Sequence, residues 1–311
     1  MGISLLDEKV FEGRDIISTK NLSREEIELI FTIAGRMKTV LTQSSDLLQH
    51  KILLTFFFEP STRTRLSFES AMQRLGGSVI SVPTSAVSRS SDQISETVED
   101  AARTAQSYAD IIVVRHLVDG SAARFAENCD VPVINAGDGD NEHPTQALLD
   151  MYTIMEERGS LDGLKMLMIG DMKFRAKHSL GYALSKFNDV QVYLLSPENL
   201  RLPMREREEF DRLGLSYQEV TSIEEIIDKL DVIYIHPTGR ARSEVSRDDR
   251  YRVTLTKLGK AQKNVMVLHP LPRFDELSTD IDSTPHAKYF DQVFNGLLIR
   301  MALLALVLGR I

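Results

Sequence analysis

Short apolar runs alternate with helix-like segments along most of this chain, and that alternation limits the folds open to it. The runs, such as ILLTFFF at 52–58 and IIVVR at 111–115, are rich in β-branched and aromatic residues. Such runs are typical of strands in a parallel sheet that is covered on both faces. The segments between them carry apolar residues at helical spacing, so the pattern predicts an α/β fold of parallel sheets flanked by helices.

The predicted strands fall into two groups. The first group lies at 52–58, 78–82, 111–115 and 131–135, with helices expected to begin near Thr62, Ser95 and Ala122. The second comprises the runs MLMIGD, VQVYLLSP, DVIYIHP and VMVLHPLP, with helices expected near His178, Met204 and Ile223. An N-terminal helix is expected to start after Ser23, because Glu26 stands at the position that completes a capping box.

An apolar segment at helical spacing, 143–158, separates the two groups of strands. We therefore expect two domains with a boundary near this segment. The first domain is predicted to comprise residues 1–145, completed by a C-terminal helix within 291–311 that packs back across it. The second is predicted to comprise residues 146–290.

Composition excludes several classes of function. The net charge of −8 argues against a general nucleic-acid-binding protein, so any anion site must be local. The single cysteine, Cys129, excludes an intrachain disulfide and is expected to be a small buried or half-exposed residue rather than a nucleophile. We find neither a signal peptide nor an apolar run of membrane length, and expect a cytoplasmic protein that binds no membrane.

The stretch STRTR follows the first predicted strand at the expected start of a helix. The hydroxyls of Ser61, Thr62 and Thr64 and the guanidinium of Arg63 would all lie near the helix N-terminus. Unpaired backbone N–H groups and the positive end of the helix dipole favour an anion there. The stretch therefore indicates a phosphate-binding site.

A purely structural role for the same stretch remains open. Ser61 or Thr62 would then cap the helix, and the arginines would be solvated or pair with Glu59 and Glu69. The phosphate interpretation gains support from other polar clusters that follow predicted strands. These are Arg115 with His116, the sequence GDGDNEHPTQ at 137–146, and HPLPR at 269–273. Ligands of open parallel sheets gather at the carboxyl ends of the strands.

Seven motifs occur in an order that resembles the catalytic subunits of the aspartate carbamoyltransferase family. They are FFEPSTRTRLSFESAMQRLGGSV, VVRH, PVINAGDG, HPTQALLD, IGDMK, VLHPLPR and RMALLALVLG. The resemblance implies a carbamoyltransferase-like fold and transfer of a carbamoyl group from carbamoyl phosphate to the α-amine of aspartate, in pyrimidine synthesis. It also implies a homotrimer with active sites shared between neighbours, in some relatives joined to regulatory subunits.

The resemblance assigns roles residue by residue. Ser61, Thr62, Arg63 and Thr64 would hold the phosphate; Arg115, His143 and Gln146 would hold the carbamoyl end; and the backbone of Pro270 and Leu271 would accept from its amide. Thr64, Arg115 and His143 would be catalytic, because donors aimed at the carbonyl oxygen stabilise the negative charge that attack by an amine creates. Arg63 would be catalytic because it neutralises the departing phosphate. This scheme needs neither a metal nor a cofactor, and we expect none. Glu59 and Asp138 are expected to be structural partners of nearby donors.

The chain departs from the family pattern where the acceptor amino acid would bind. The family has a lysine in the loop that reaches into the neighbouring subunit, whereas this chain has no lysine between Lys51 and Lys165. Arg89 is the candidate to replace it, although a planar guanidinium is not equivalent to an ammonium. The family sequence DLKYGRTVHS becomes DMKFRAKHS, in which Arg175 is the expected carboxylate ligand and Lys177 a competing candidate.

A third departure replaces the family's TRxQ by HPTGRARSE, where Arg240 and Arg242 are either surface charges or a rebuilt carboxylate site. Three functions are therefore open. The chain is an aspartate carbamoyltransferase, a carbamoyltransferase for a different acceptor, or a diverged, non-catalytic paralogue that retains the carbamoyl phosphate site. The first is preferred because the resemblance spans nearly the whole chain.

Overall fold

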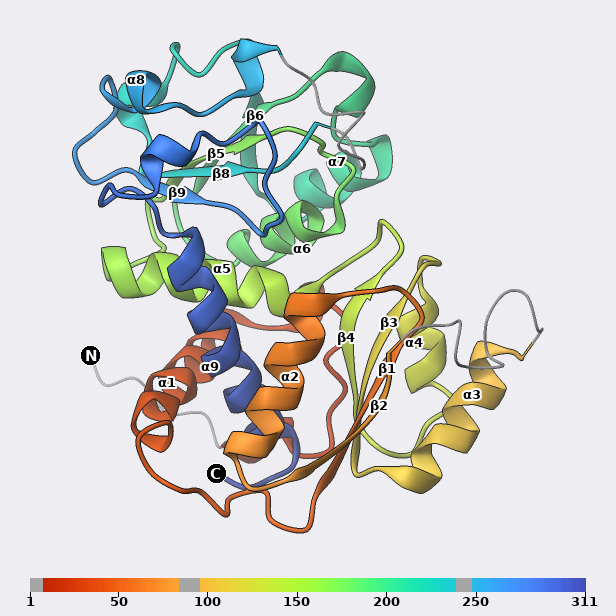
Figure 1. The fold of residues 1–311 in the computed structure, drawn as a ribbon. Helices are drawn as coiled ribbons and strands as arrows, with labels where there is room; N and C mark the ends of the chain where they lie inside the picture. The colour runs from red at the N-terminus through yellow and green to blue at the C-terminus, as the bar shows by residue number, and fades with distance from the viewer. Residues whose placement is uncertain (1–7, 84–95, 239–247) are drawn as a thin grey trace. The chain divides into compact units, whose positions relative to one another are not determined.

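The computed structural model describes residues 8–83, 96–238 and 248–311. By its internal contacts the chain divides into two compact units (Figure 1). Unit 1 comprises Met1–Leu148 with Asn295–Ile311, and unit 2 comprises Leu149–Phe294. Each unit is built on one parallel sheet, so the predicted α/β class is confirmed.

The sheet of unit 1 has the strand order β2-β1-β3-β4. Its strands are β1 (Ile52–Phe57), β2 (Ser78–Val82), β3 (Ile111–His116) and β4 (Val133–Asp138). The fourth begins two residues later than predicted and runs on to Asp138, because it pairs with β3 as far as His116. All the pairings are parallel, so the carboxyl ends of the four strands lie at one edge of the sheet.

Helices cover both faces of this sheet (Figure 1). They are α1 (Arg24–Val40), α2 (Thr62–Arg74), α3 (Val98–Ala105), α4 (Ser121–Ala126) and the C-terminal part of α9 (Tyr289–Val307). The capping box between Ser23 and Glu26 is present as predicted. Helix α3 begins three residues after the predicted start at Ser95, which lies outside the described residues, because Thr97 caps it by accepting the Asp100 N–H. Alanines of α3 and Phe125 of α4 pack on the apolar side chains of β1 and β3.

The C-terminal part of α9 belongs to the core of unit 1. The Arg300 guanidinium lies 5.1 Å from the centre of the Phe68 ring in α2 and donates to Thr145 Oγ1 at 3.3 Å. The Gly13 N–H donates to Val307 O at the end of the helix. Helix α9 is long and apolar enough to cross a membrane by composition, but 72% of its apolar window is buried inside the protein, as in the core helix of a globular domain.

The sheet of unit 2 has the order β7-β6-β5-β8-β9 and is also entirely parallel. Its strands are β5 (Lys165–Ile169), β6 (Gln191–Leu195), β7 (Ser216–Glu219), β8 (Val232–Ile235) and β9 (Met266–Leu268). The helices are α6 (Arg175–Leu184), α7 (Met204–Arg212) and the short α8 (Leu255–Leu258). Helix α5 (Pro144–Arg158) contains the point at which the chain passes from one unit to the other.

Unit 2 departs from the predicted pattern in two places. Strand β7 is an additional strand that the pattern does not predict, because its sequence SYQE is polar and largely exposed at the edge of the sheet. The α-helix expected near Ile223 is replaced by one turn and a 3₁₀ segment at Ile227–Lys229. Ile223, Ile226 and Ile227 are all buried in the core of unit 2, and only four residues lie between Ile227 and the start of β8, which leaves no length for a helix.

Candidate active site

The start of α2 presents the STRTR hydroxyls as predicted. Ser61 occupies the N-cap position but makes no side-chain capping hydrogen bond. Thr62 is the first helical residue, and Thr64 is buried in the first turn. Capping therefore does not account for the Ser61 hydroxyl. The structural alternative holds for Arg65, whose Nε lies 3.6 Å from Glu69 Oε1 one turn later.

Arg115 is fixed at the carboxyl end of β3 by two partners. Its Nε lies 3.0 Å from Glu59 Oε2, and its guanidinium donates to the Ala136 carbonyl in β4 at 3.1 Å. Glu59 follows β1, so this pair joins the ends of two neighbouring strands. The expected structural role of Glu59 is confirmed. His116, by contrast, accepts the Val118 N–H at Nδ1 and so belongs to its own turn.

His143 lies directly before α5 and meets the STRTR segment. Its Nε2 lies 3.5 Å from Thr64 Oγ1, and both side chains are buried. Gln146 is half-buried in the first turn of the same helix, and its N–H donates to the His143 carbonyl at 3.0 Å. Unit 1 therefore brings together two of the polar clusters that the sequence singled out.

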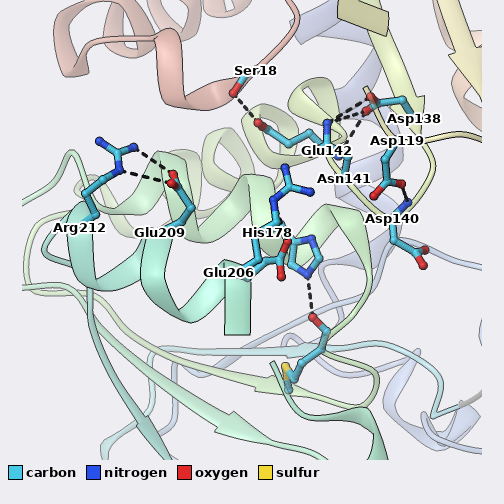
Figure 2. Close-up of polar contacts among 12 residues, drawn as sticks. Ser18, Asp119, Asp138, Asp140, Asn141, Glu142, His178, Glu206, Glu209 and Arg212 are labelled. Atoms are coloured by element: carbon cyan, nitrogen blue, oxygen red, sulfur yellow. Dashed lines mark hydrogen bonds and ion pairs between the residues drawn. The ribbon is translucent and has the colours of Figure 1, made fainter. Parts of the chain in front are cut away.

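Two buried carboxylates hold the loop that carries His143 (Figure 2). Asp138 accepts from the Asn135 amide at 2.9 Å, from the Gly120 N–H at 2.8 Å and from Asn141. Burial nevertheless raises the pKa of Asp138 above its usual value. The expected structural role of Asp138 is confirmed.

The second carboxylate, Glu142, has partners near the N-terminal end of the described chain. It accepts from the Ser18 hydroxyl, and also from the Thr19 N–H at 3.1 Å (Figure 2). Its own backbone pairs with that of Asp138. The residue before His143 is thus fixed through both its side chain and its main chain, a contribution that the sequence motif did not reveal.

In unit 2, the expected carboxylate ligand Arg175 is the first residue of α6 and is buried. The competing candidate, Lys177, is 1% exposed, and its Nζ donates to the Ile169 carbonyl at 2.6 Å and to the Asp171 carbonyl at 3.0 Å. His178 Nε2 lies 2.9 Å from the Met172 carbonyl (Figure 2). Lys177 is therefore occupied in holding the end of β5, and Arg175 is the stronger candidate of the two.

Lys177 should make stability depend on pH. Burial lowers the pKa of its ammonium from 10.5 to about 7. Between these values the unfolded chain holds a proton that the folded chain lacks, so the free energy of unfolding rises with pH across this window. The rise from pH 7 to pH 9 should be about 2 kcal/mol, because one proton contributes at most about 1.4 kcal/mol per pH unit.

Urea unfolding at a series of pH values tests this expectation. The variant Lys177→Met should lose the rise between pH 7 and pH 9. Lys165→Met is the matched control. It removes an exposed lysine from the start of β5, the strand whose end Lys177 contacts, and it retains Lys177. Equal pH dependence in the wild type and Lys177→Met would contradict the assignment.

The segment HPLPR follows β9, as predicted, at a carboxyl end of the second sheet. Pro270 is partly exposed, and Leu271 has φ of +57°, which a non-glycine residue adopts only when its surroundings hold it there. The Arg273 guanidinium donates to Asp282 Oδ2 at 2.6 Å, and the Tyr289 hydroxyl also donates to Asp282. The Arg273 side chain at the end of this segment is therefore tied to the rest of unit 2.

Three candidate residues, Arg89, Arg240 and Arg242, lie outside the described residues. Cys129 is half-buried, and burial raises the pKa of its thiol, which disfavours the nucleophilic thiolate. Among residues 8–83, 96–238 and 248–311, no group of three or more histidine, cysteine or carboxylate side chains has the arrangement of a metal site.

The chain thus has two parallel-sheet units, and a helix N-terminus and a buried histidine meet at the edge of the first sheet. Residues 14–156 match the aspartate/ornithine carbamoyltransferase, carbamoyl-P binding domain, and residues 162–307 match the aspartate/ornithine carbamoyltransferase, Asp/Orn binding domain. The chain belongs to the aspartate/ornithine carbamoyltransferase family.

Individual relatives lie in the aspartate branch of this family. The chain is 46% identical over 307 residues to the aspartate carbamoyltransferase catalytic subunit of Thermococcus onnurineus, covering 96% of this chain and 98% of that protein. It is 47% identical over 302 residues to that of Aliivibrio fischeri strain MJ11, covering 95% and 97%. The resemblance found in the motifs is therefore confirmed.

A solved structure supports the same placement. The aspartate transcarbamoylase of Trypanosoma cruzi, in complex with carbamoyl phosphate and aspartate, superposes with a TM-score of 0.89 at 34% identity. The match covers 98% of this chain and all of that one. The predicted carbamoyltransferase-like fold is confirmed.

Proposed function

We propose that this chain transfers the carbamoyl group of carbamoyl phosphate to the α-amine of L-aspartate, giving N-carbamoyl-L-aspartate and phosphate in pyrimidine biosynthesis. The observation that carries the proposal is the contact between Thr64 and His143, beside Arg115 at the same sheet edge. This arrangement occurs in a chain that is similar over nearly its whole length to aspartate carbamoyltransferase catalytic subunits.

Different residues bind the two halves of carbamoyl phosphate. Ser61, Thr62, Arg63 and Thr64 hold the phosphate at the N-terminus of α2, where the helix dipole and the guanidinium stabilise the leaving dianion. Arg115, His143 and Gln146 hold the carbamoyl group. The backbone of Pro270 and Leu271, in unit 2, accepts from the carbamoyl amide; this assignment rests on the matching HPLPR motif.

The reaction follows from this placement of donors. The aspartate nitrogen forms a bond to the carbamoyl carbon while the bond from that carbon to the phosphate oxygen breaks, and the proton that the nitrogen gives up passes to the departing phosphate, which leaves as a dianion. Negative charge develops on the carbamoyl oxygen, where Thr64, Arg115 and His143 donate to it. Holding the two substrates in line provides much of the remaining acceleration.

Arginines bind the acceptor amino acid in this proposal. Arg175 binds the α-carboxylate from the start of α6. Arg240 or Arg242 binds the side-chain carboxylate, and Arg89 takes the place of the family's loop lysine. A different acceptor is the second candidate, because Pro237 stands near the position of the family's carboxylate-binding arginine and Lys177 is committed to main-chain carbonyls.

An acceptor panel separates these candidates. Phosphate release is measured with saturating carbamoyl phosphate and, in turn, aspartate, ornithine, other amino acids and simple amines. Release that depends on aspartate supports the proposal. Phosphate release only with another amine would reassign the acceptor. No phosphate release with any amine would indicate a protein that merely binds carbamoyl phosphate.

We further propose a cytoplasmic homotrimer whose active sites are shared between neighbouring subunits. The support is the family membership together with the resemblance of the motifs to catalytic subunits. Whether regulatory subunits join such a trimer is a separate question, which light scattering of the native complex from its host would answer.

A further inference from the structure

The turn after β9 is held from inside by a histidine and a glutamate. His269 and Glu276 are each 1% exposed. The backbone N–H of Leu271 donates to His269 Nδ1 at 2.7 Å, and His269 Nε2 lies 2.8 Å from Glu276 Oε1. Both ring nitrogens are therefore used, and one of them fixes the backbone of the residue with positive φ.

The hydrogen bonds define the protonation state of the pair. A backbone N–H can only donate, so Nδ1 of His269 must carry the lone pair and Nε2 the proton. Glu276 then accepts at Oε1, which also accepts the Phe274 N–H at 2.9 Å. Burial alone would raise the pKa of Glu276, but the hydrogen bonds from His269 and Phe274 outweigh it and lower the pKa.

His269 is itself anchored independently of the turn. Its N–H donates to Gln292 Oε1 at 2.7 Å, and the Gln292 amide donates to Asp150 Oδ1 at 2.7 Å; all three residues are buried. The ring of His236 lies parallel to that of His269 with the centres 6.3 Å apart. The imidazole therefore has a fixed place from which it can hold Leu271.

We propose that His269 is a positioning residue that selects carbamoyl phosphate over inorganic phosphate. It holds Leu271 in the left-handed conformation so that the backbone can accept from the carbamoyl amide, and Glu276 locks its tautomer. This inference rests on the proposed function, in which Pro270 and Leu271 contact the carbamoyl group. Inorganic phosphate has no amide, so disturbing Leu271 should leave its binding unchanged.

Calorimetric titration of the full chain with carbamoyl phosphate and, separately, with inorganic phosphate tests the inference. His269→Leu removes the acceptor for the Leu271 N–H. His269→Asn retains an acceptor near the Nδ1 position, and Glu276→Gln retains an acceptor for Nε2. His286→Asn is the control, because His286 is a half-buried histidine of unit 2 whose Nδ1 lies 2.8 Å from the Val265 carbonyl, away from the turn.

In His269→Leu, we expect affinity for carbamoyl phosphate to fall roughly 10- to 100-fold, since misplacing one group by about 1 Å has effects of this size. Affinity for inorganic phosphate should stay within about twofold, because its ligands at the start of α2 are untouched. His269→Asn should recover most of the preference, and Glu276→Gln and His286→Asn should retain it.

A merely structural role would lower both affinities together or neither, and either result would overturn the inference. If His269→Leu does not fold, comparison of His269→Asn with His269→Gln decides, because only asparagine places an acceptor near Leu271; equal preference in both would refute the assignment. A wild-type chain that binds carbamoyl phosphate no better than phosphate would instead refute the proposed function, and the inference with it.

Discussion

Replacing Arg63 by alanine should weaken carbamoyl phosphate binding by about 100-fold or more, because a charge-assisted contact to a phosphate is worth roughly 2 to 4 kcal/mol. Arg63 is the second residue of α2, beside the N-terminal backbone N–H groups and the hydroxyls of Thr62 and Thr64. Removing the guanidinium leaves those weaker donors alone with a dianion. Isothermal titration with carbamoyl phosphate measures the effect directly.

Arg65→Ala is the matched control for this experiment. Arg65 lies two residues further along the same helix and pairs with Glu69. Its removal should change carbamoyl phosphate affinity by less than about threefold, since surface ion pairs contribute little. Near-normal affinity in Arg63→Ala, or an equal loss in both variants, would refute the assignment of Arg63 to the phosphate.

Gly170→Ala should destabilise the protein by roughly 3 to 5 kcal/mol, at the upper end of single-substitution effects. Gly170 follows β5 with φ of +98°, and an added Cβ would lie 1.9 Å from the His236 carbonyl oxygen after β8. Because that atom belongs to the main chain, relief requires the ends of two central strands to separate. Equilibrium unfolding in urea measures the change.

Gly214→Ala separates the two causes of this effect. Gly214 also has positive φ, +72°, but an added Cβ there meets nothing within 4 Å. It should cost only about 1 to 2 kcal/mol, the strain of a left-handed residue without a clash. Similar losses in the two variants would mean that the β5 and β8 ends do not approach as closely as described.

The features that were predictable from the sequence are those that depend on residues close together in the chain. The apolar run before STRTR predicted both β1 and the start of α2 at Thr62, because a buried strand followed by hydroxyls is a recognisable helix start. The capping box at Ser23 and Glu26 was predictable for the same reason. In the candidate site, the meeting of Thr64 and His143 agrees with the rule that polar groups follow parallel strands to one edge.

Features set by tertiary contacts were not predictable. Strand β7 is polar and gains its place only by pairing with β6 at the sheet edge. Glu142 in unit 1 and Glu276 in unit 2 are buried acidic residues with no local signal. Glu142 bonds with Ser18, which is distant in sequence, and Glu276 bonds with His269 across a turn. Lys177 resembled a ligand by its position, yet the fold turns its ammonium onto the end of β5.

The central claim is transfer of a carbamoyl group to aspartate, and nuclear magnetic resonance of the product tests it most directly. The purified chain is incubated with carbon-13-labelled carbamoyl phosphate and L-aspartate, and the label is followed. We expect N-carbamoyl-L-aspartate to form in equal amount with phosphate, at a turnover of roughly 1 to 1,000 per second. Absence of this product, while carbamoyl phosphate still binds, would contradict the claim.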